Sequence, residues 1–355
     1  MKPKIVAFFT SLTLLLIVQY RNALVSPFFQ DDFELLSSAS PEYFLKTVPD
    51  FHYHPISNQI FYFASYSLFA HNPFGYHLIH FVITILSPFL LYQISKILLR
   101  SQRKALLATF FYGLNISLFA LYYWIAVSYF VFGSLFFFLT IFLYLKSKNS
   151  FWPTLSFVLA LLSNELALVV PGVLFLISFY LRKWSKTLLA IIFTDLIFIF
   201  LKFFWIGFPV ENAYKIELST QVFATLRWYL LRAFNLPEGV LNFTNTHIFL
   251  VFIVFVAIIL LSLHLYVRST KQNWRLFILG PTWFLIGALP FFFLPGHMSA
   301  YYIAFSLPGM VIIFAEILSP RKLILLLAML LYLAASTTGL DFLSQTHWTI
   351  LKPTR

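Results

Sequence analysis

The 355-residue sequence contains no cysteine and carries charge on only 10% of its residues. Without cysteine, neither a disulfide nor a thiolate metal site can hold a loop in place, so loop order must come from packing. Soluble domains carry charge on about a quarter of their residues, and so sparse a supply excludes an ordinary soluble fold. Acids are scarcer than bases, with 12 Asp and Glu against 24 Lys and Arg.

The sequence is rich in apolar residues. Sixty-one per cent of the residues are hydrophobic, and the mean hydropathy is +0.87. Runs of roughly 20 apolar residues, enough to cross ~30 Å of hydrocarbon, recur along the chain. We therefore expect an all-α, polytopic membrane protein of about eleven transmembrane helices, forming a single integral membrane domain (1–355) with no soluble domain. The expected spans are residues 5–24, 77–98, 105–122, 128–145, 151–163, 166–181, 187–205, 248–267, 275–294, 300–318 and 322–340.

The distribution of charge predicts the orientation, because basic loops next to spans stay cytoplasmic. One arrangement, with the N-terminus cytoplasmic, places almost all basic breaks inside: Lys2, Lys4, Arg100, Arg103, Lys104, Lys146, Lys148, Arg182, Lys183, Lys186, Arg268, Lys271, Arg275, Arg321 and Lys322. The same arrangement places most acids outside: Asp31, Asp32, Glu34, Glu42, Asp50, Glu165, Glu211, Glu217, Glu238 and Asp341. The net charge of +12 is then mostly a consequence of topology, and no nucleic-acid partner is needed to explain it.

The first apolar segment has an alternative interpretation as a signal peptide, since Lys2 and Lys4 precede it. No small-residue cleavage pattern follows, so we expect it to stay as an anchor. Three parts of the domain are then distinguished: a catalytic core (1–205) with a long outer loop (25–76), a second outer loop (206–246), and C-terminal helices (247–355). Within the outer loops, residues 56–72 and 218–237 have the pattern of amphipathic helices at the membrane surface.

Two features of the outer side suggest chemistry. Asp31 and Asp32 are adjacent carboxylates just past the first span. The alternative to a catalytic role is a structural one, in which they start a helix. Residues 151–181 must cross out and back with about 23 Å per leg, which is less than the hydrocarbon core, so the turn at 163–165 should be recessed. Glu165 in that turn would be an ionisable group at depth, and such groups are functional candidates, although it too could simply cap a helix.

Three segments resemble the membrane part of the GT-C glycosyltransferases: NALVSPFFQDDF, then HYHPISNQIFYFASYSLFAHNPFGYHLIHFVITIL, then LALLSNELALVVPGVLFL. The likeness is strongest to the O-mannosyltransferase group that carries tetratricopeptide repeats and to its short bacterial relatives. It covers about the first 180 residues; the later half matches loosely, at RWYLLRAFNLP and HMSAYYIAFSLPG.

The resemblance assigns roles to individual residues. Asp31 and Asp32 match the family's acidic pair, with Asp31 taken as the catalytic base and Asp32 as its partner, and Glu165 shapes the site. The second and third motifs imply donor contacts from Tyr53, His54 and Asn164. Apart from the resemblance, Arg227, Arg232 and His297 lie on the expected outer side and are candidates for the donor phosphate. The alternatives are that the two arginines extend to lipid headgroups and that His297 starts an interfacial helix. The family has basic residues where this chain has His54 and Asn164.

The reaction that the resemblance implies is transfer of a mannose-like hexose from a polyprenyl-phosphate donor to an acceptor hydroxyl on a protein, glycan or lipid. It would occur on the extracytoplasmic face of a bacterial or archaeal cell membrane and needs no cofactor. Independently of the likeness, a carboxylate base contributes about 10²- to 10⁴-fold to such a step, and the departing phosphate requires positive charge or strong donors. A single displacement inverts the anomeric centre.

Other interpretations stay open. A transporter or lipid flippase would use intramembrane charges, and Asp195 and Lys202 lie on nearly one helix face, where they could line a cavity. A catalytically inactive binding protein would explain the altered motif residues. The histidines of the first loop and second span, His52, His54, His71, His77 and His80, lack a tight ligand spacing, so no metal site is expected. Glu316 is expected to meet Arg321 and Lys322.

Overall fold

The computed structural model describes residues 3–44, 53–207, 215–241, 245–269 and 273–350, and the structural statements below concern these residues. Several loop residues considered in the sequence lie outside them: Lys2, Asp50, His52, Glu211 and Lys271. The described chain is helical, with short connections and no β-strand in those ranges.

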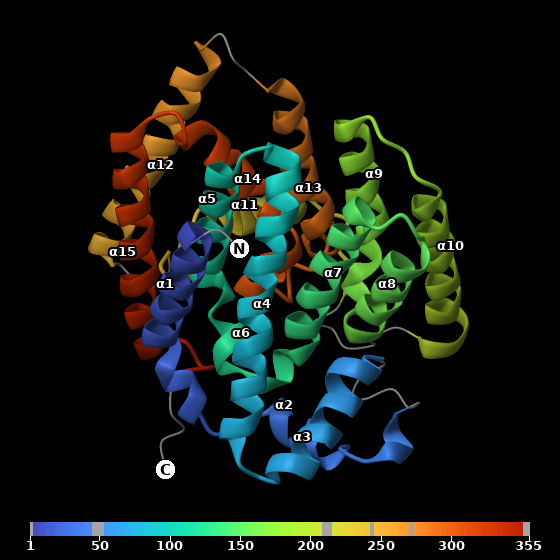
Figure 1. Cartoon of the computed structure of the whole chain (residues 1–355). Coiled ribbons are helices and arrows are strands. Elements are labelled where there is room, and N and C mark those ends of the chain that lie inside the picture. The colour runs from blue at the N-terminus through green and yellow to red at the C-terminus, as the bar shows by residue number, and fades with distance from the viewer. Residues whose placement is uncertain (1–2, 45–52, 208–214, 242–244, 270–272, 351–355) are drawn as a thin grey trace.

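The main helices follow one another in a bundle (Figure 1). They are α1 (Pro3–Tyr20), α2 (Asp31–Ser37), α3 (Phe61–Phe69), α4 (Pro73–Leu99), α5 (Gln102–Gly113), α6 (Ala120–Tyr123), α7 (Ser128–Lys146), α8 (Phe151–Ser163), α9 (Val170–Leu181), α10 (Lys186–Leu201), α11 (Gln221–Ala233), α12 (Thr246–Val267), α13 (Trp274–Phe292), α14 (Leu307–Leu318) and α15 (Lys322–Thr346).

The predicted polytopic membrane fold is confirmed. Within the described residues, seven helical segments are long and apolar enough to cross a membrane, and α5 with the helical turns after it makes a pair bent by 54°, which is either a broken span or a re-entrant loop. Three shorter apolar helical segments, 151–163, 165–181 and 307–318, correspond to the remaining expected spans. The chain is a multi-pass membrane protein.

The two helices on either side of the predicted recessed turn are short, as expected from the 31 residues available for crossing out and back. Helix α8 has 13 residues, which rise about 20 Å, less than a hydrocarbon core. A 3₁₀ turn over Glu165–Val169 joins it to α9. Ser163 and Asn164 are buried. The turn is thus enclosed by protein instead of projecting as a loop.

The first outer loop packs on the bundle. It contains α2 and α3, which lie together at the lower end of the molecule in Figure 1. A π-helical turn over Pro55–Ile60 precedes α3 and buries Ser57, Asn58 and Gln59. Only one face of the predicted surface helix is therefore available to lipid, and it exposes Leu68 among others. The second predicted amphipathic segment forms α11.

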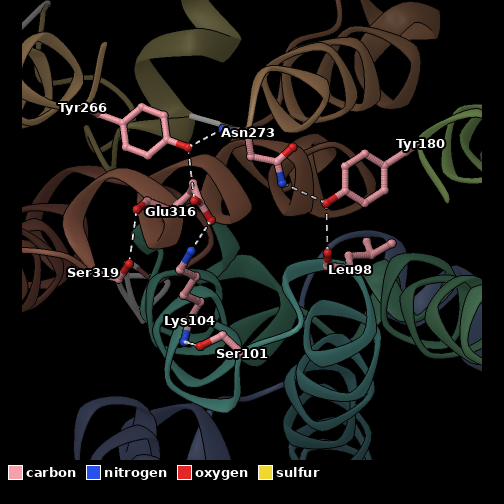
Figure 2. Close-up of polar contacts among 8 residues, drawn as sticks. All are labelled: Leu98, Ser101, Lys104, Tyr180, Tyr266, Asn273, Glu316 and Ser319. Carbon is pink, nitrogen blue, oxygen red and sulfur yellow. Dashed lines mark hydrogen bonds and ion pairs between the residues drawn. The ribbon is translucent and has the colours of Figure 1, made fainter. Parts of the chain in front are cut away.

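The opposite end of the bundle carries the basic breaks and a partly buried ion pair between Lys104 and Glu316, which Figure 2 shows in close-up. Lys104 Nζ lies 2.8 Å from Glu316 Oε2. The expectation that Glu316 meets Arg321 and Lys322 is wrong, because α14 packs closely on α5 and brings Lys104 to the carboxylate. Arg321 instead donates to the carbonyl of Leu265 at 3.1 Å.

Candidate functional site

The acidic pair opens α2 directly after a strained residue. Gln30 has φ 48° and ψ −121°, a backbone conformation that favours glycine and costs about 1–3 kcal/mol for other residues. The reversal at Gln30 sends the two carboxylates in different directions. Asp31 is exposed, whereas Asp32 is fully buried.

Asp32 is held by donors from three segments. Its Oδ2 accepts from the backbone N–H of Phe29 at 3.1 Å, and its Oδ1 accepts from the Tyr62 hydroxyl at 3.2 Å. Burial raises the pKa of Asp32 to about 7, although hydrogen bonds from Phe29, Tyr62 and the Ala126 backbone partly oppose that shift. Both carboxylate oxygens are thus used internally, which suits a residue that fixes the loop.

Asp31 and Glu165 come from distant segments but face a common neighbour. Both carboxylates lie within electrostatic reach of the Tyr129 hydroxyl on α7, and that hydroxyl is 3.2 Å from the hydroxyl of Tyr301. That the first and third motifs share one site, as the resemblance implies, stays a prediction. Because a base must first be able to reach its proton, the exposed Asp31 is the better candidate than the enclosed Asp32.

The recessed turn is tied to the first outer loop. The Ser57 hydroxyl donates to the carbonyl of Ser163 at 2.7 Å. Asn164 caps the following turn, its Oδ1 accepting from Leu166 N–H at 2.9 Å. Its Nδ2 is buried and has no hydrogen-bond partner. A donor aimed into protein without an acceptor is costly, and an oxygen of a bound ligand would satisfy it.

Lys202 supplies a cation that the sequence interpretation did not place in the site. Its Nζ lies 2.5 Å from Glu165 Oε2, and its side chain is only 7% exposed. The residue stands in a π-helical turn, Lys202–Ile206, at the end of α10. Asp195 lies earlier in α10, and a cavity lined by Asp195 and Lys202 stays a prediction. The only sequence indication was a lone lysine near the end of an apolar span.

The second motif lines the same region with aromatic rings. The His54 imidazole stacks on Tyr129, with ring centroids 5.3 Å apart and planes at 7°. Tyr53 meets the edge of Trp205 at 5.7 Å. His297 lies 5.7 Å from Tyr302 between ring centroids. Tyr302 follows Tyr301 in the chain, so His54 and His297 flank one tyrosine cluster around Tyr129.

The two arginines of α11 occupy different environments. Arg227 is exposed. Arg232 is buried, and its NH1 donates to the carbonyls of Leu236 at 2.7 Å and Pro237 at 2.6 Å. Burial lowers the pKa of Arg232 to about 10, with Glu238 acting in the opposite sense. These contacts give Arg232 a role in holding the end of α11, and a phosphate role for either arginine stays a prediction.

A groove of about 900 Å³ adjoins the acidic pair. Asn22, residues 25–30, Phe33 and Tyr123 form one wall, and Ser344 of α15 with residues 348–350 forms the other. Phe29 lies in this wall and packs against Trp348, with ring centroids 5.9 Å apart. The groove is lined mainly by aromatic and aliphatic side chains, and it ends one residue before Asp31.

Two histidines considered as ligands are part of the scaffold. His77 is buried in α4, its ring nitrogens 3.2 Å from the Tyr122 carbonyl and 3.1 Å from the Ser26 carbonyl. His80 is also buried and packs on Phe61. Among the described residues, no group of three metal-binding side chains is found. His77 thus helps to hold the segment around Ser26, which precedes the acidic pair in the chain.

Comparison with known proteins gives a likeness of fold. No protein-family model matches the sequence, and no curated protein matches it. Among solved structures, the crystal structure of ArnT from Cupriavidus metallidurans bound to undecaprenyl phosphate is similar, with a TM-score of 0.52 and 14% sequence identity. The match covers 91% of this chain and 61% of that one, so this chain matches less than two thirds of the neighbour's length. It shows that this chain shares the fold of that membrane protein over most of its own length.

Proposed function

We propose that this protein is a GT-C-type glycosyltransferase that moves a hexose from a polyprenyl-phosphate donor to an acceptor hydroxyl on the extracytoplasmic face. The observation that carries the proposal is that the turn at residues 163–165 is joined both to the loop that follows the acidic pair, through the Ser57–Ser163 hydrogen bond, and to the cation Lys202, through Glu165. A proton acceptor and a buried cation, Lys202, then belong to one site. The shared fold with a protein crystallised with undecaprenyl phosphate supports the class of donor.

In the proposed reaction, Asp31 removes the proton of the acceptor hydroxyl as its oxygen attacks the anomeric carbon. The bond from that carbon to the phosphate oxygen breaks, and its electron pair leaves with the polyprenyl phosphate. Positive charge and hydrogen-bond donors near the leaving oxygen stabilise this transition state; Lys202 would supply the charge, and the unpartnered Asn164 Nδ2 would supply a donor. The proton ends on Asp31, and attack opposite the leaving group inverts the anomeric centre.

The position of Lys202 also concerns the two alternative functions, an inactive binding protein and a transporter. An inactive binding protein was favoured only by the loss of basic residues at His54 and Asn164, and Lys202 offers a cation beside the second of these positions. A transporter was favoured by Asp195 with Lys202, and the Lys202–Glu165 ion pair also fits a transporter, so the transfer assay below decides between the two. Because charge from the protein is available to the leaving phosphate, we propose that no cofactor is required.

The apolar groove beside Phe29 and Trp348 is proposed as the wall for the donor's isoprenoid chain, since it leads to Asp31 and consists largely of aromatic and aliphatic side chains. The finer choice of mannose rests on the likeness to the tetratricopeptide-repeat O-mannosyltransferases. Protein, glycan and lipid acceptors are all compatible with the outer loops as proposed.

The test is transfer from a panel of radiolabelled polyprenyl-phosphate hexoses by the purified protein in nanodiscs, with native membrane extract supplying acceptors. We expect one donor to be consumed in the presence of a chelator, with free polyprenyl phosphate as a product, and no consumption by an Asp31→Asn/Asp32→Asn double variant that still binds donor. Binding of donor without turnover by the wild type would favour the inactive-binder alternative and overturn the proposal.

A further inference from the structure

A second polar cavity lies at the basic end of the bundle, far along the chain from the proposed catalytic residues. It has a volume of about 210 Å³ and is lined by the end of α4 (Leu98, Leu99 and Arg100), the end of α9 (Tyr180 and Leu181) and the start of α13 (Asn273 and Arg275). Since a water in the liquid occupies about 30 Å³, the cavity has room for a phosphate group with ordered water.

Hydrogen bonds fix the floor of this cavity (Figure 2). Asn273 Nδ2 donates to the Tyr180 hydroxyl at 3.1 Å, and that hydroxyl donates to the Leu98 carbonyl at 3.0 Å. The Asn273 backbone N–H donates to the Tyr266 hydroxyl at 2.7 Å, which donates to Glu316 Oε1 at 3.2 Å. The walls are therefore held by residues from α4, α9, α12, α13 and α14, and the cavity is a built feature of the fold.

The charge of the cavity is positive. Arg100 and Arg275 are both exposed, and no hydrogen bond or ion pair within the described residues engages either guanidinium. Glu316 is the only acid described at this end of the bundle, and Lys104 neutralises it at 2.8 Å. The basic residues described there are far more numerous: Lys96, Arg100, Arg103, Lys104, Arg182, Lys183, Lys186, Arg268, Arg275, Arg321 and Lys322.

The start of α13 adds donors to the two guanidinium groups. The side chain of Asn273, the residue before the helix, makes no cap on α13 because it is bonded to Tyr180 instead. Leu276 N–H donates to the Asn273 carbonyl at 3.0 Å, so the N–H groups of Trp274 and Arg275 are left for a ligand, and together with the helix dipole they favour an anion. Arginine forks pair well with the oxygens of phosphate.

The surroundings identify the source of the anion. Trp184 and Trp274 stand next to the cavity's helices in the chain and are 57% and 55% exposed, and exposed tryptophans mark the membrane–water interface. Basic pockets between membrane helices at that level bind lipid headgroups. We propose that this cavity binds the phosphate of an anionic phospholipid in the adjoining leaflet, with Arg100 and Arg275 as its ligands. The proposal is independent of glycosyl transfer.

The test is native mass spectrometry of the full-length protein released from nanodiscs of phosphatidylcholine containing 20% phosphatidylglycerol, a lipid fraction chosen for the assay. An Arg100→Gln/Arg275→Gln variant is compared with an Arg103→Gln/Arg268→Gln variant, which removes the same charge at the same end but not from the cavity lining. We expect retention of phosphatidylglycerol to fall roughly tenfold or more in the cavity variant alone. Arg275→Gln by itself, with a smaller loss, serves if the double variant folds poorly.

Equal loss of lipid in the cavity and control variants would overturn the proposal, because it would show only a diffuse attraction to surface charge. Competition separates the sources of phosphate. If millimolar inorganic phosphate displaces the bound phosphatidylglycerol as well as phosphatidylglycerol itself does, the site is one for free phosphate and the lipid assignment is wrong. Insensitivity to inorganic phosphate, with loss confined to the cavity variant, would support it.

Discussion

At the scale of single residues, burial separates two carboxylates that are adjacent in sequence. Asp32 is enclosed by Phe29 and Tyr62, and Asp31 is exposed. One aspartate therefore holds the loop while the other is able to accept a proton from a substrate. The preference for Asp31 as base, which the sequence left nearly undecided, gains support from this difference in access.

The raised pKa of Asp32 predicts a pH-dependent stability. Its pKa is about 7 in the folded protein and about 3.9 when unfolded. Between these values the unfolded chain has lost the proton and the folded chain keeps it, so folding stability is lost as pH rises from about 4 to about 7, by up to roughly 1.4 kcal/mol per pH unit. Asp32→Asn removes this dependence.

The measurement is the thermal unfolding midpoint of purified wild-type and Asp32→Asn protein from pH 4.5 to 8. We expect the midpoint of the wild type, relative to the variant, to fall with rising pH and to level off above pH 7. Glu34→Gln, which changes an exposed acid in the same helix, should keep the wild-type trend because Asp32 is still present. A wild-type to Asp32→Asn difference that does not vary with pH would contradict the buried, protonated carboxyl.

Variants of Lys202 and Glu165 should affect the free energy of unfolding and the affinity for donor differently. Lys202→Gln leaves the Glu165 carboxylate without the cation 2.5 Å away, and we expect a loss of about 1–3 kcal/mol in the free energy of unfolding because the pair is mostly buried. Adding Glu165→Gln removes the stranded charge and should restore most of that loss. Affinity for the polyprenyl-phosphate donor should fall in both variants and recover in Lys202→Arg.

Denaturation and donor-binding titrations of the same preparations make that comparison. If the double variant binds donor as tightly as the wild type does, Lys202 is a structural cation and the phosphate contact is refuted.

At the scale of elements, the site depends on how closely α7 approaches the recessed turn. A Cβ added at Gly133 would lie 2.7 Å from Asn164 Cβ and 3.2 Å from Phe305 Cζ. The first distance is too short for two carbon atoms, so the turn can reach Tyr129 only because α7 has no side chain at this position. Packing between helices thus sets the distance between motifs that the sequence keeps far apart.

Gly133→Ala is expected to displace the turn that holds Asn164 and to lower the transfer rate by roughly 10²-fold, since a shift of about 1 Å has that effect on a positioned group. Gly113→Ala is the matched control, because its added Cβ would make ordinary contacts of 3.6 Å or longer. Steady-state transfer rates of both variants, with unfolding midpoints to confirm folding, make the comparison. Equal rates for the two alanine variants would exclude a positioning role for this contact.

At the scale of the whole molecule, composition and segment length predicted the membrane spans and the short pair of helices, but the contacts between distant segments could not be predicted. The apolar runs gave the spans, and the short stretch 151–181 gave the enclosed turn, because both follow from local length. The pairs Lys202–Glu165 and Lys104–Glu316 depend on which helices pack together, and no pattern within one segment encodes that. The GT-C resemblance predicted that the acidic pair and the turn converge.

The orientation in the membrane is a further prediction for the whole molecule. The absence of native cysteine allows single reporters to be introduced without background. Glu34→Cys should react with a membrane-impermeant maleimide in intact cells, whereas Arg103→Cys should react only after permeabilisation, because both residues are exposed and charge places them on opposite sides. The reverse pattern of labelling would place the acidic pair in the cytoplasm.

The most direct measurement is the turnover of the consumed donor by purified Asp31→Asn protein in nanodiscs, beside Glu34→Gln as a control from the first turn of the same helix. Loss of the base should reduce turnover by about 10²- to 10⁴-fold while donor binding and folding stay intact, and Glu34→Gln should turn over at the wild-type rate. Wild-type turnover in Asp31→Asn would contradict a transfer reaction that uses Asp31 as its base.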